Sequence, residues 1–292
     1  RKRPTMDIRA ILAGLAFALI WSSAFTSARV IVAEAPPILS LSLRFLISGL
    51  IGVGLARLLG QTWRLNRAQW QTIFIFGLCQ NALYLGLNFV AMQTIEASLA
   101  SIIASTMPLL VGLVGWVWFK EKLPIVGVWG LIVGVIGAAL IMGVRIQGGT
   151  DFFGIILCIV GVLSITVATL SMRGVSSGGN LLMIVGLQML VGAIILAFPG
   201  VVFEEWEVVW TPKLLLAFSY TVLMPGLLAT FIWFWLVGRI GAVRAATFHF
   251  LNPFFGVLIA AIFLGESLGI WDAVGVIVIM AGIFMVQTSR NI

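Results

Sequence analysis

The chain has 292 residues, of which 61% are hydrophobic and 9% are charged, and its mean hydropathy is +1.17. A soluble fold of this size has too little interior to bury so much apolar surface, so the composition excludes a soluble globular protein and predicts a polytopic membrane protein. The formal net charge of +7 alone would suit a nucleic-acid partner, but the distribution of the basic residues along the chain predicts no nucleic acid.

A membrane-spanning helix needs about 20 apolar residues, because about 30 Å of hydrocarbon is crossed at about 1.5 Å per residue. Ten segments meet this requirement, and the short connections between them leave no room for a soluble domain. In chain order these segments are residues 8–31, 38–58, 70–91, 96–118, 124–144, 153–172, 180–199, 213–237, 242–264 and 270–288. The sequence therefore predicts an all-α membrane protein with ten transmembrane helices.

The two halves of the chain repeat one another. Residues 95–137 align with residues 240–282 without a gap at an offset of 145, and 12 of the 43 positions are identical, against roughly four expected from the composition. The identities include the pairs Pro108 and Pro253, Glu121 and Glu266, Gly130 and Gly275, and Gly137 and Gly282. Five spans per half is an odd number, so residues 1–145 and 146–292 are predicted to form two inverted five-helix repeats, a construction typical of alternating-access transporters.

The basic residues indicate the orientation of the spans. If the N-terminus is cytoplasmic, thirteen basic residues fall at cytoplasmic span ends and three fall outside. The thirteen are Arg1, Lys2, Arg3, Arg9, Arg57, Arg64, Arg67, Lys120, Lys122, Arg173, Arg239, Arg244 and Arg290; the three are Arg29, Arg145 and Lys213. This asymmetry predicts that both termini are cytoplasmic.

A polar stripe follows the third predicted span. Gln80, Tyr84 and Asn88 recur every four residues and therefore share one helical face, next to Asn81. Carboxamides in hydrocarbon are costly unless they are hydrogen-bonded, so the stripe predicts the wall of a ligand cavity. Contact with a neighbouring helix is the alternative.

Further candidates for substrate binding lie on the first, fourth, eighth and ninth spans, which also carry polar or aromatic side chains in their apolar cores. They are Trp21, Ser22, Ser101, Ser105, Thr230, Trp233, His249 and Asn252. Helix packing remains the alternative for each Ser and Thr, because hydroxyls bond readily to carbonyls of their own helix. The sixth span is also polar and is predicted to face the cavity.

The fifth and tenth spans have almost no polar side chain and are predicted to be scaffold. Their glycines allow close backbone approach, so we expect these two spans to pack against each other or against a second subunit. Pro108 and Pro253 occupy equivalent positions near mid-membrane and are predicted to act as paired hinges, with simple kinks as the alternative.

Arg44 and His249 are the ionisable residues that the sequence places well inside the hydrocarbon, where such groups are functional candidates. We predict that His249 contacts substrate or shapes the cavity, and a neutral core histidine or a proton relay is the alternative. No Asp or Glu falls in mid-membrane, which disfavours a carrier of cationic drugs.

Motifs for catalysis are missing from the sequence. It has no His-rich cluster, no nucleophile elbow, no phosphate-binding loop and no cysteine pair at metal spacing, so we predict no catalytic residue, no metal, no cofactor and no enzymatic activity. An intramembrane hydrolase built on Ser105 and His249 is the alternative from another class, and nothing in the spacing supports it.

The repeated motif runs from Ile95 through Pro108 to Glu121-Lys122-Leu123 and Gly130. Its second copy runs from Ile240 through Pro253 to Glu266-Ser267-Leu268 and Gly275. In this pattern the chain resembles the drug/metabolite transporter superfamily and its ten-helix EamA-type exporters. With Trp21-Ser22-Ser23 in the first span and the Tyr84 stripe, it is most similar to the YddG-type exporters of aromatic amino acids.

The resemblance implies a carrier in the bacterial inner membrane that exports aromatic and other neutral amino acids and related metabolites by alternating access through a central cavity. Its partners would be the small-molecule substrate and the lipid bilayer, with a monomer favoured. Carboxamides and hydroxyls would bind the amino-acid backbone, and Trp21, Tyr84 and Trp233 would stack on the substrate's side chain. Transport of another small metabolite or a drug by the same fold is the alternative.

Overall fold

The computed structural model describes residues 8–120, 122–172, 175–240, 245 and 248–289. Throughout this part of the chain the regular structure is helical and contains no strand. Nine of its helices are long and apolar enough to cross a membrane, and Phe248–Leu264 is a shorter apolar helix in the position of the ninth predicted span. The predicted all-α fold with ten apolar spans is therefore confirmed.

The first half contains five spans, two of which are interrupted. The elements are α1 (Ile8–Glu34), α2 (Pro37–Leu58), α3 (Arg67–Phe76) continued by η1 (Gly77–Leu85) and α4 (Gly86–Ala91), α5 (Ala97–Ala104) followed by α6 (Met107–Val117), and α7 (Ile125–Gln147). The second half repeats this order. Its elements are α8 (Phe152–Ser171), α9 (Leu181–Phe203), α10 (Pro212–Thr221) continued by η2 (Val222–Leu228) and α11 (Ala229–Ile240), η3 (Phe248–Leu251) followed by α13 (Asn252–Leu264), and α14 (Ile270–Ser289).

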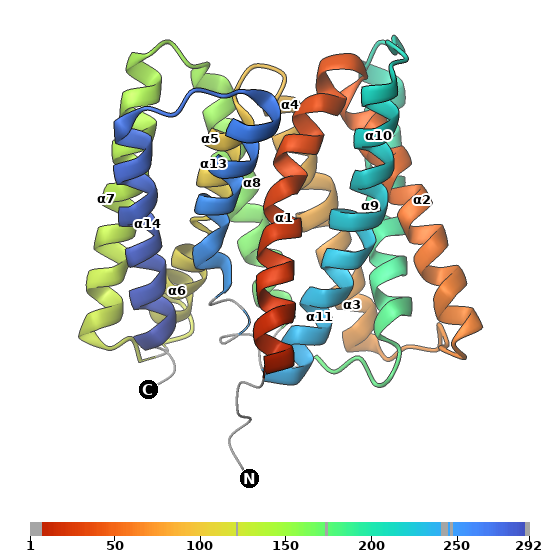
Figure 1. Cartoon of the computed structure of the whole chain (residues 1–292). Coiled ribbons are helices and arrows are strands. Elements are labelled where there is room, and N and C mark those ends of the chain that lie inside the picture. The colour runs from red at the N-terminus through yellow and green to blue at the C-terminus, as the bar shows by residue number, and fades with distance from the viewer. Residues whose placement is uncertain (1–7, 121, 173–174, 241–244, 246–247, 290–292) are drawn as a thin grey trace.

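The two halves enter the bundle from opposite ends. Helix α1 begins at the end where α14 finishes, which we call the terminal end, whereas α8 begins at the other end, which we call the far end (Figure 1). The second five-helix unit is therefore inverted relative to the first, as the odd number of spans per half predicts.

The third and eighth spans both widen into a π-helix near their middle. Segment η1 begins at Gly77 and η2 at Val222, which are related by the same offset of 145 that relates the two repeats. Short π segments inside α-helices frequently occur at functional sites, because they shift the side chains out of the regular register. Nothing in the apolar pattern of the sequence indicated them.

The predicted hinge prolines each lie in the first turn of a new helical segment. Pro108 follows the break between α5 and α6, and Pro253 follows the short 3₁₀ turn η3 at the start of α13. A proline in a first turn removes no intrahelical hydrogen bond, because the N–H at that position has no helical acceptor. The prolines therefore start helices at two equivalent breaks instead of kinking continuous helices, and their role as hinges stays a prediction.

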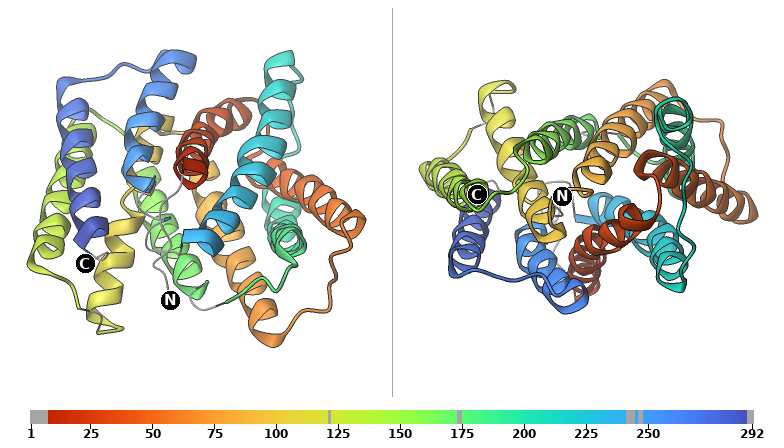
Figure 2. Two further views of the ribbon diagram at one scale, coloured as in Figure 1. Left: turned by 60° about the horizontal axis from the view of Figure 1, so that its bottom comes forward. Right: turned by 90° about the horizontal axis from the view of Figure 1, so that it is seen from above.

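Two long helix pairs flank the centre of the bundle. Helices α7 and α14 pack along their length on one side, and α2 packs against α9 on the other (Figure 2). A Cβ built on Gly130 would lie 2.8 Å from the carbonyl oxygen of Gly282, and one built on Gly186 would lie 2.7 Å from the backbone nitrogen of Val53. The predicted packing of the fifth span against the tenth is therefore confirmed within one chain.

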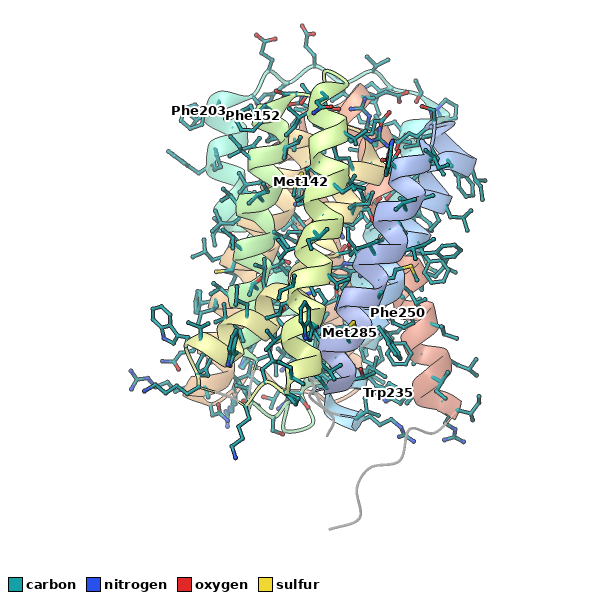
Figure 3. All side chains as sticks on the ribbon, turned by 90° about the vertical axis from the view of Figure 1, so that its left-hand side faces the viewer. Met142, Phe152, Phe203, Trp235, Phe250 and Met285 are labelled. Atoms are coloured by element: carbon teal, nitrogen blue, oxygen red, sulfur yellow. The ribbon has the colours of Figure 1, made fainter. Side chains whose placement is uncertain are left out.

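The outer surface of the α7–α14 pair is apolar. Figure 3 shows this side of the molecule, with Met142 on α7, Met285 on α14 and Phe250 near the terminal end. Ile132, Val135 and Ile277 are exposed on the two helices. Exposed large aliphatic side chains along a whole helix suit a surface in contact with lipid tails.

Two glutamates cap helices at the far end. The carboxylate of Glu204 accepts hydrogen bonds from the backbone nitrogens of Ile38 and Leu39, both at 2.7 Å, at the start of α2. The carboxylate of Glu266 accepts from the nitrogens of Ala97 at 2.8 Å and Ser98 at 3.0 Å, at the start of α5. Each carboxylate satisfies two N–H groups that lack a helical acceptor and lies at the positive end of the helix dipole.

Replacing Glu204 with Gln is expected to lower the unfolding free energy by about 1 kcal/mol, because a neutral amide loses the favourable interaction with the helix dipole and can accept through one oxygen only. Thermal unfolding in detergent measures the effect. The neighbouring Glu205 is exposed and no hydrogen bond or ion pair is recorded for it among the described residues, so Glu205→Gln is the control. Equal losses in both variants would contradict the capping role.

Candidate functional site

A small pocket, which we call the central pocket, lies between the first, second, third and eighth spans and extends from the middle of the bundle toward the far end. It encloses about 20 Å³ in this conformation, which is room for roughly one water molecule. Its lining residues are Trp21, Ala24, Phe25, Ala28, Arg44, Tyr84, Leu85, Asn88, Phe89, Met92 and Pro225. Three residues predicted from the sequence to bind substrate, namely Trp21, Tyr84 and Asn88, meet in this central pocket.

Tyr84 and Asn88 are presented by the π segment η1 and the helix α4 that follows it. Tyr84 is 1% exposed, and its hydroxyl has no hydrogen-bond partner among the residues described. The Asn88 amide nitrogen donates to the carbonyl of Tyr84 at 2.8 Å, and its oxygen accepts from the thiol of Cys158 at 3.4 Å. Helix α8 thus holds Asn88 in place, while the phenol of Tyr84 keeps its polar group for another partner.

Arg44 is a pocket residue that the sequence-based site did not include. It lies on α2, is 3% exposed, and donates from Nε to the carbonyl of Thr221 at 3.2 Å. Pro225, four residues later in η2, has no N–H, so no α-helical hydrogen bond reaches that carbonyl from this position. The signal for Arg44 was present in the sequence, since it is the arginine that falls well inside a predicted span.

An aromatic cluster closes the pocket toward the terminal end. Phe17 precedes Trp21 by one turn of α1, and its ring centroid lies 5.4 Å from that of Trp21, 5.0 Å from that of Trp233 and 5.3 Å from that of His249. The ring centroids of Trp233 and His249 lie 4.9 Å apart. This cluster joins the first, eighth and ninth spans and contains three of the predicted substrate-binding residues.

The ninth span carries a pair of polar side chains that keep free hydrogen-bonding atoms. The Asn252 amide nitrogen lies 2.8 Å from Nδ1 of His249, and the Ser22 hydroxyl donates to the backbone carbonyl of Asn252 at 3.3 Å. His249 Nε2 and Asn252 Oδ1 are buried and have no partner among the described residues. A buried unpaired donor or acceptor is costly, so both atoms suit contact with water or with substrate.

The remaining predicted residues lie outside the central pocket. Asn81 donates to the backbone carbonyl of Gln188 on α9 at 2.9 Å and also contacts its side-chain oxygen. Ser105 and Thr230 donate to carbonyls of their own helices. Ser101 packs against Gly256 of α13, and Gln80 is buried. Asn81 and Ser101 thus contact neighbouring helices, and the buried Ser101 hydroxyl has no hydrogen-bond partner among the described residues. The predicted role of these five residues in substrate binding is untested.

Larger cavities open at the two ends of the bundle. The one at the terminal end has a volume of about 680 Å³ and lies between α3, α8, α9 and α11, with Gln69, Thr72 and Trp235 on its wall. Two at the far end have volumes of about 460 and 580 Å³ and are lined by charged residues that include Arg29, Glu96 and Arg145. We call these end cavities vestibules, and the central pocket lies between them along the bundle.

Charged groups at the far end are held by specific contacts. The Thr94 hydroxyl donates to the Asp151 carboxylate at 2.7 Å, and this hydrogen bond, with those from the backbone nitrogens of Phe153 and Gly154, lowers the pKa of that carboxyl. Asp151 thereby caps the start of α8. Within the described residues no group of three His, Cys, Asp or Glu side chains is brought together that could bind a metal ion.

In the described part of the chain, an inverted bundle of ten apolar spans encloses a polar and aromatic pocket and has a vestibule at each end, which defines a membrane protein of the transporter class. The chain belongs to the EamA-like transporter family, whose sequence pattern matches residues 8–143 and, separately, residues 152–288. It is therefore a multi-span transporter of the drug/metabolite superfamily. The exact boundary at residue 145 stays a prediction.

Similar proteins align with this chain over most of their length. The chain is 28% identical over 279 residues to the uncharacterized transporter YvbV of Bacillus subtilis, which covers 95% of this chain and 91% of that protein. It is 26% identical over 281 residues to the uncharacterized inner membrane transporter YedA of Escherichia coli, covering 91% and 88%. A solved crystal structure has the same fold, with a TM-score of 0.71 at 20% identity, covering 97% of this chain and 99% of that one. The names of these relatives state transport and no substrate.

Proposed function

We propose that the chain exports neutral amino acids, aromatic ones included, across the bacterial inner membrane by alternating access. The observation that carries the proposal is the composition of the central pocket, where the aromatic rings of Trp21, Phe25 and Phe89 adjoin the polar groups of Tyr84 and Asn88. Rings provide apolar surface for a substrate side chain, and the polar groups suit the backbone atoms of an amino acid.

Alternating access is supported by the layers on either side of the pocket. The aromatic cluster of Phe17, Trp233 and His249 separates it from the terminal end. Toward the far end, the side chain of Arg29 on α1 donates to the carbonyl of Met92 at the end of the third span. The pocket has room for one water molecule and is closed on both sides, by the aromatic cluster and by the Arg29–Met92 contact. In the proposed cycle this closed state opens to one vestibule at a time.

We infer that the terminal end faces the cytoplasm, because the basic residues at span ends concentrate there. We also favour a monomer as the transporting unit. The glycine faces of α7 and α14, which were candidates for a subunit contact, are used within the chain.

The test is flux of labelled phenylalanine, threonine and methionine into proteoliposomes. We expect saturable uptake that falls about tenfold in Tyr84→Ala, because loss of the ring removes aromatic contact worth roughly 0.5–1.5 kcal/mol together with a hydroxyl partner. Tyr220→Ala is the control, since the chain's second tyrosine lies on α10, does not line the pocket, and bonds the Ser23 hydroxyl at 2.6 Å, so it reports the loss of a tyrosine that only joins α10 to α1. Saturable flux unaffected by Tyr84→Ala would remove the pocket from the mechanism, and no flux of any amino acid would point to another small metabolite.

A further inference from the structure

We propose that Arg44 binds the carboxylate of the transported molecule, so that the negative charge and not the amino group is the recognised feature. The inference rests on the proposed use of the central pocket for transport and specifies the chemical class of its substrate. It predicts that monocarboxylates with an apolar or aromatic body are accepted even when they carry no amine.

Arg44 is a buried cation that has no counter-ion among the described residues. Its side chain lies eight residues into α2 and is 3% exposed. Both ion pairs recorded in the described part of the chain involve Arg145, at the far end. A guanidinium stays protonated in proteins, and its removal from water is costly unless an anion or several acceptors replace the solvent.

The protein itself satisfies only part of the guanidinium. Nε donates to the carbonyl of Thr221, and Cζ lies 4.8 Å from the ring centroid of Phe45. No hydrogen bond of the two terminal nitrogens is recorded among the described residues. Those nitrogens form the edge that matches a carboxylate in a two-pronged hydrogen bond.

Contacts between α2 and η2 hold Arg44 in place. Ser48, one turn after Arg44 on α2, donates to the carbonyl of Val222 at 2.9 Å. The neighbouring carbonyl of Thr221 accepts a hydrogen bond from Nε of Arg44. Arg44 and Ser48 thus attach α2 to the start of the π segment η2. Gly226 leaves the space for this contact, since a Cβ there would lie 3.0 Å from the Ser48 hydroxyl and 3.5 Å from Nε. A positioned side chain loses less entropy when it binds a ligand.

The pocket around Arg44 has a composition that suits a carboxylate attached to an apolar group. The hydroxyl of Tyr84, which has no partner among the described residues, is a second donor on the same pocket, and Trp21, Phe25 and Phe89 supply apolar walls. Among the residues that the structure describes, no Asp or Glu lines the pocket. An ammonium group would therefore find no counter-ion, whereas one carboxylate would find a cation and a phenol.

The charge count limits the substrate further. The described lining of the central pocket contains one cationic side chain. A pyrophosphate or a dicarboxylate would therefore leave a second negative charge unpaired inside the bundle. A single carboxylate attached to an apolar body matches the pocket in both charge and surface.

The experiment compares four ligands with a phenyl ring as stabilisers of the purified protein in detergent: phenylalanine, 3-phenylpropionate, 3-phenylpropionamide and phenethylamine. We expect concentration-dependent increases in Tm with the two acids and none with the amide or the amine. In Arg44→Gln the apparent Kd for both acids should rise about tenfold or more, because a charge-assisted hydrogen bond is lost. Arg57→Gln removes the same charge from the terminal end of α2, where the guanidinium lies over Trp63, and is the matched control.

The comparison of acid with amide uses the wild-type protein, so it stands even if Arg44→Gln fails to fold. Stabilisation by the amide or amine equal to that by the acids, unchanged acid binding in Arg44→Gln, or no stabilisation by any acid would overturn the inference. Acid binding that depends on Arg44, combined with no amino-acid flux in proteoliposomes, would overturn the amino-acid proposal and leave the carboxylate site standing.

Discussion

Replacing Arg145 with Gln is expected to lower the unfolding free energy by about 2–3 kcal/mol, which corresponds to a fall in Tm of roughly 2–4 °C per kcal/mol. Arg145, in the last turn of α7, donates from Nε to Asp272 Oδ1 at 3.1 Å and from Nη2 to Oδ2 at 2.9 Å, and it also pairs with Glu96. Its loss leaves the Asp272 carboxylate, whose side chain is 7% exposed, without a cation.

This expected loss of stability is smaller than the roughly 3–5 kcal/mol for breaking a fully buried ion pair. The Glu96 side chain is 40% exposed, so water reaches the cluster of Glu96, Arg145 and Asp272. Asp272→Asn in the Arg145→Gln background is the control. The double variant contains no lone carboxylate at this position, so it should recover part of the lost stability. Equal losses in the single and double variants would mean that the charge interaction is not what stabilises this contact.

Replacing Gly282 with Leu is expected to destabilise the protein by at least about 1–3 kcal/mol and to separate α14 from α7. A Cβ at this position would lie 2.5 Å from the backbone nitrogen of Gly134 and 2.7 Å from the carbonyl oxygen of Gly130. Backbone atoms cannot rotate away as a side chain can, so the helices must move apart and lose their close packing.

Thermal unfolding in detergent measures this effect, and Gly143→Leu is the matched control. Gly143 lies on α7, the helix against which α14 packs, but a Cβ there would have no atom within 4 Å. Leucine also has the higher helix propensity, so the control should be neutral or slightly stabilised. If both variants lose the same stability, the close approach of the two helices is not the cause.

The sequence was sufficient to predict the class of fold. A mean hydropathy of +1.17 and the repeat at an offset of 145 are properties of composition and order, and they fix the number of spans and the inversion before any contact is known. Gly130 and Gly282 likewise indicated close helix packing, because a glycine has no side chain to keep two helices apart. What the sequence left open was the partner, which the structure identifies as the other repeat.

The candidate site could be predicted only in part. Trp21, Tyr84 and Asn88 meet in the central pocket, whereas Asn81, on the same predicted polar stripe, contacts Gln188 on α9. Gln80, Asn81 and Tyr84 all lie in η1, a π-helix, and residues spaced for an α-helix do not keep their common face in a π-helix. Periodicity computed for an α-helix cannot detect such a shift.

The sequence by itself determined that this protein lies in a membrane as two inverted five-helix units. The length of each apolar segment and the internal repeat are properties of residue order and need no knowledge of contacts between helices. Only the tertiary structure decided which polar groups are used up in packing and which remain free. Arg44 illustrates the difference: its burial follows from its place in an apolar span, but its position on the pocket depends on the Thr221 carbonyl, 177 residues away along the chain. Contacts between distant spans depend on how helices pack, which no local pattern specifies.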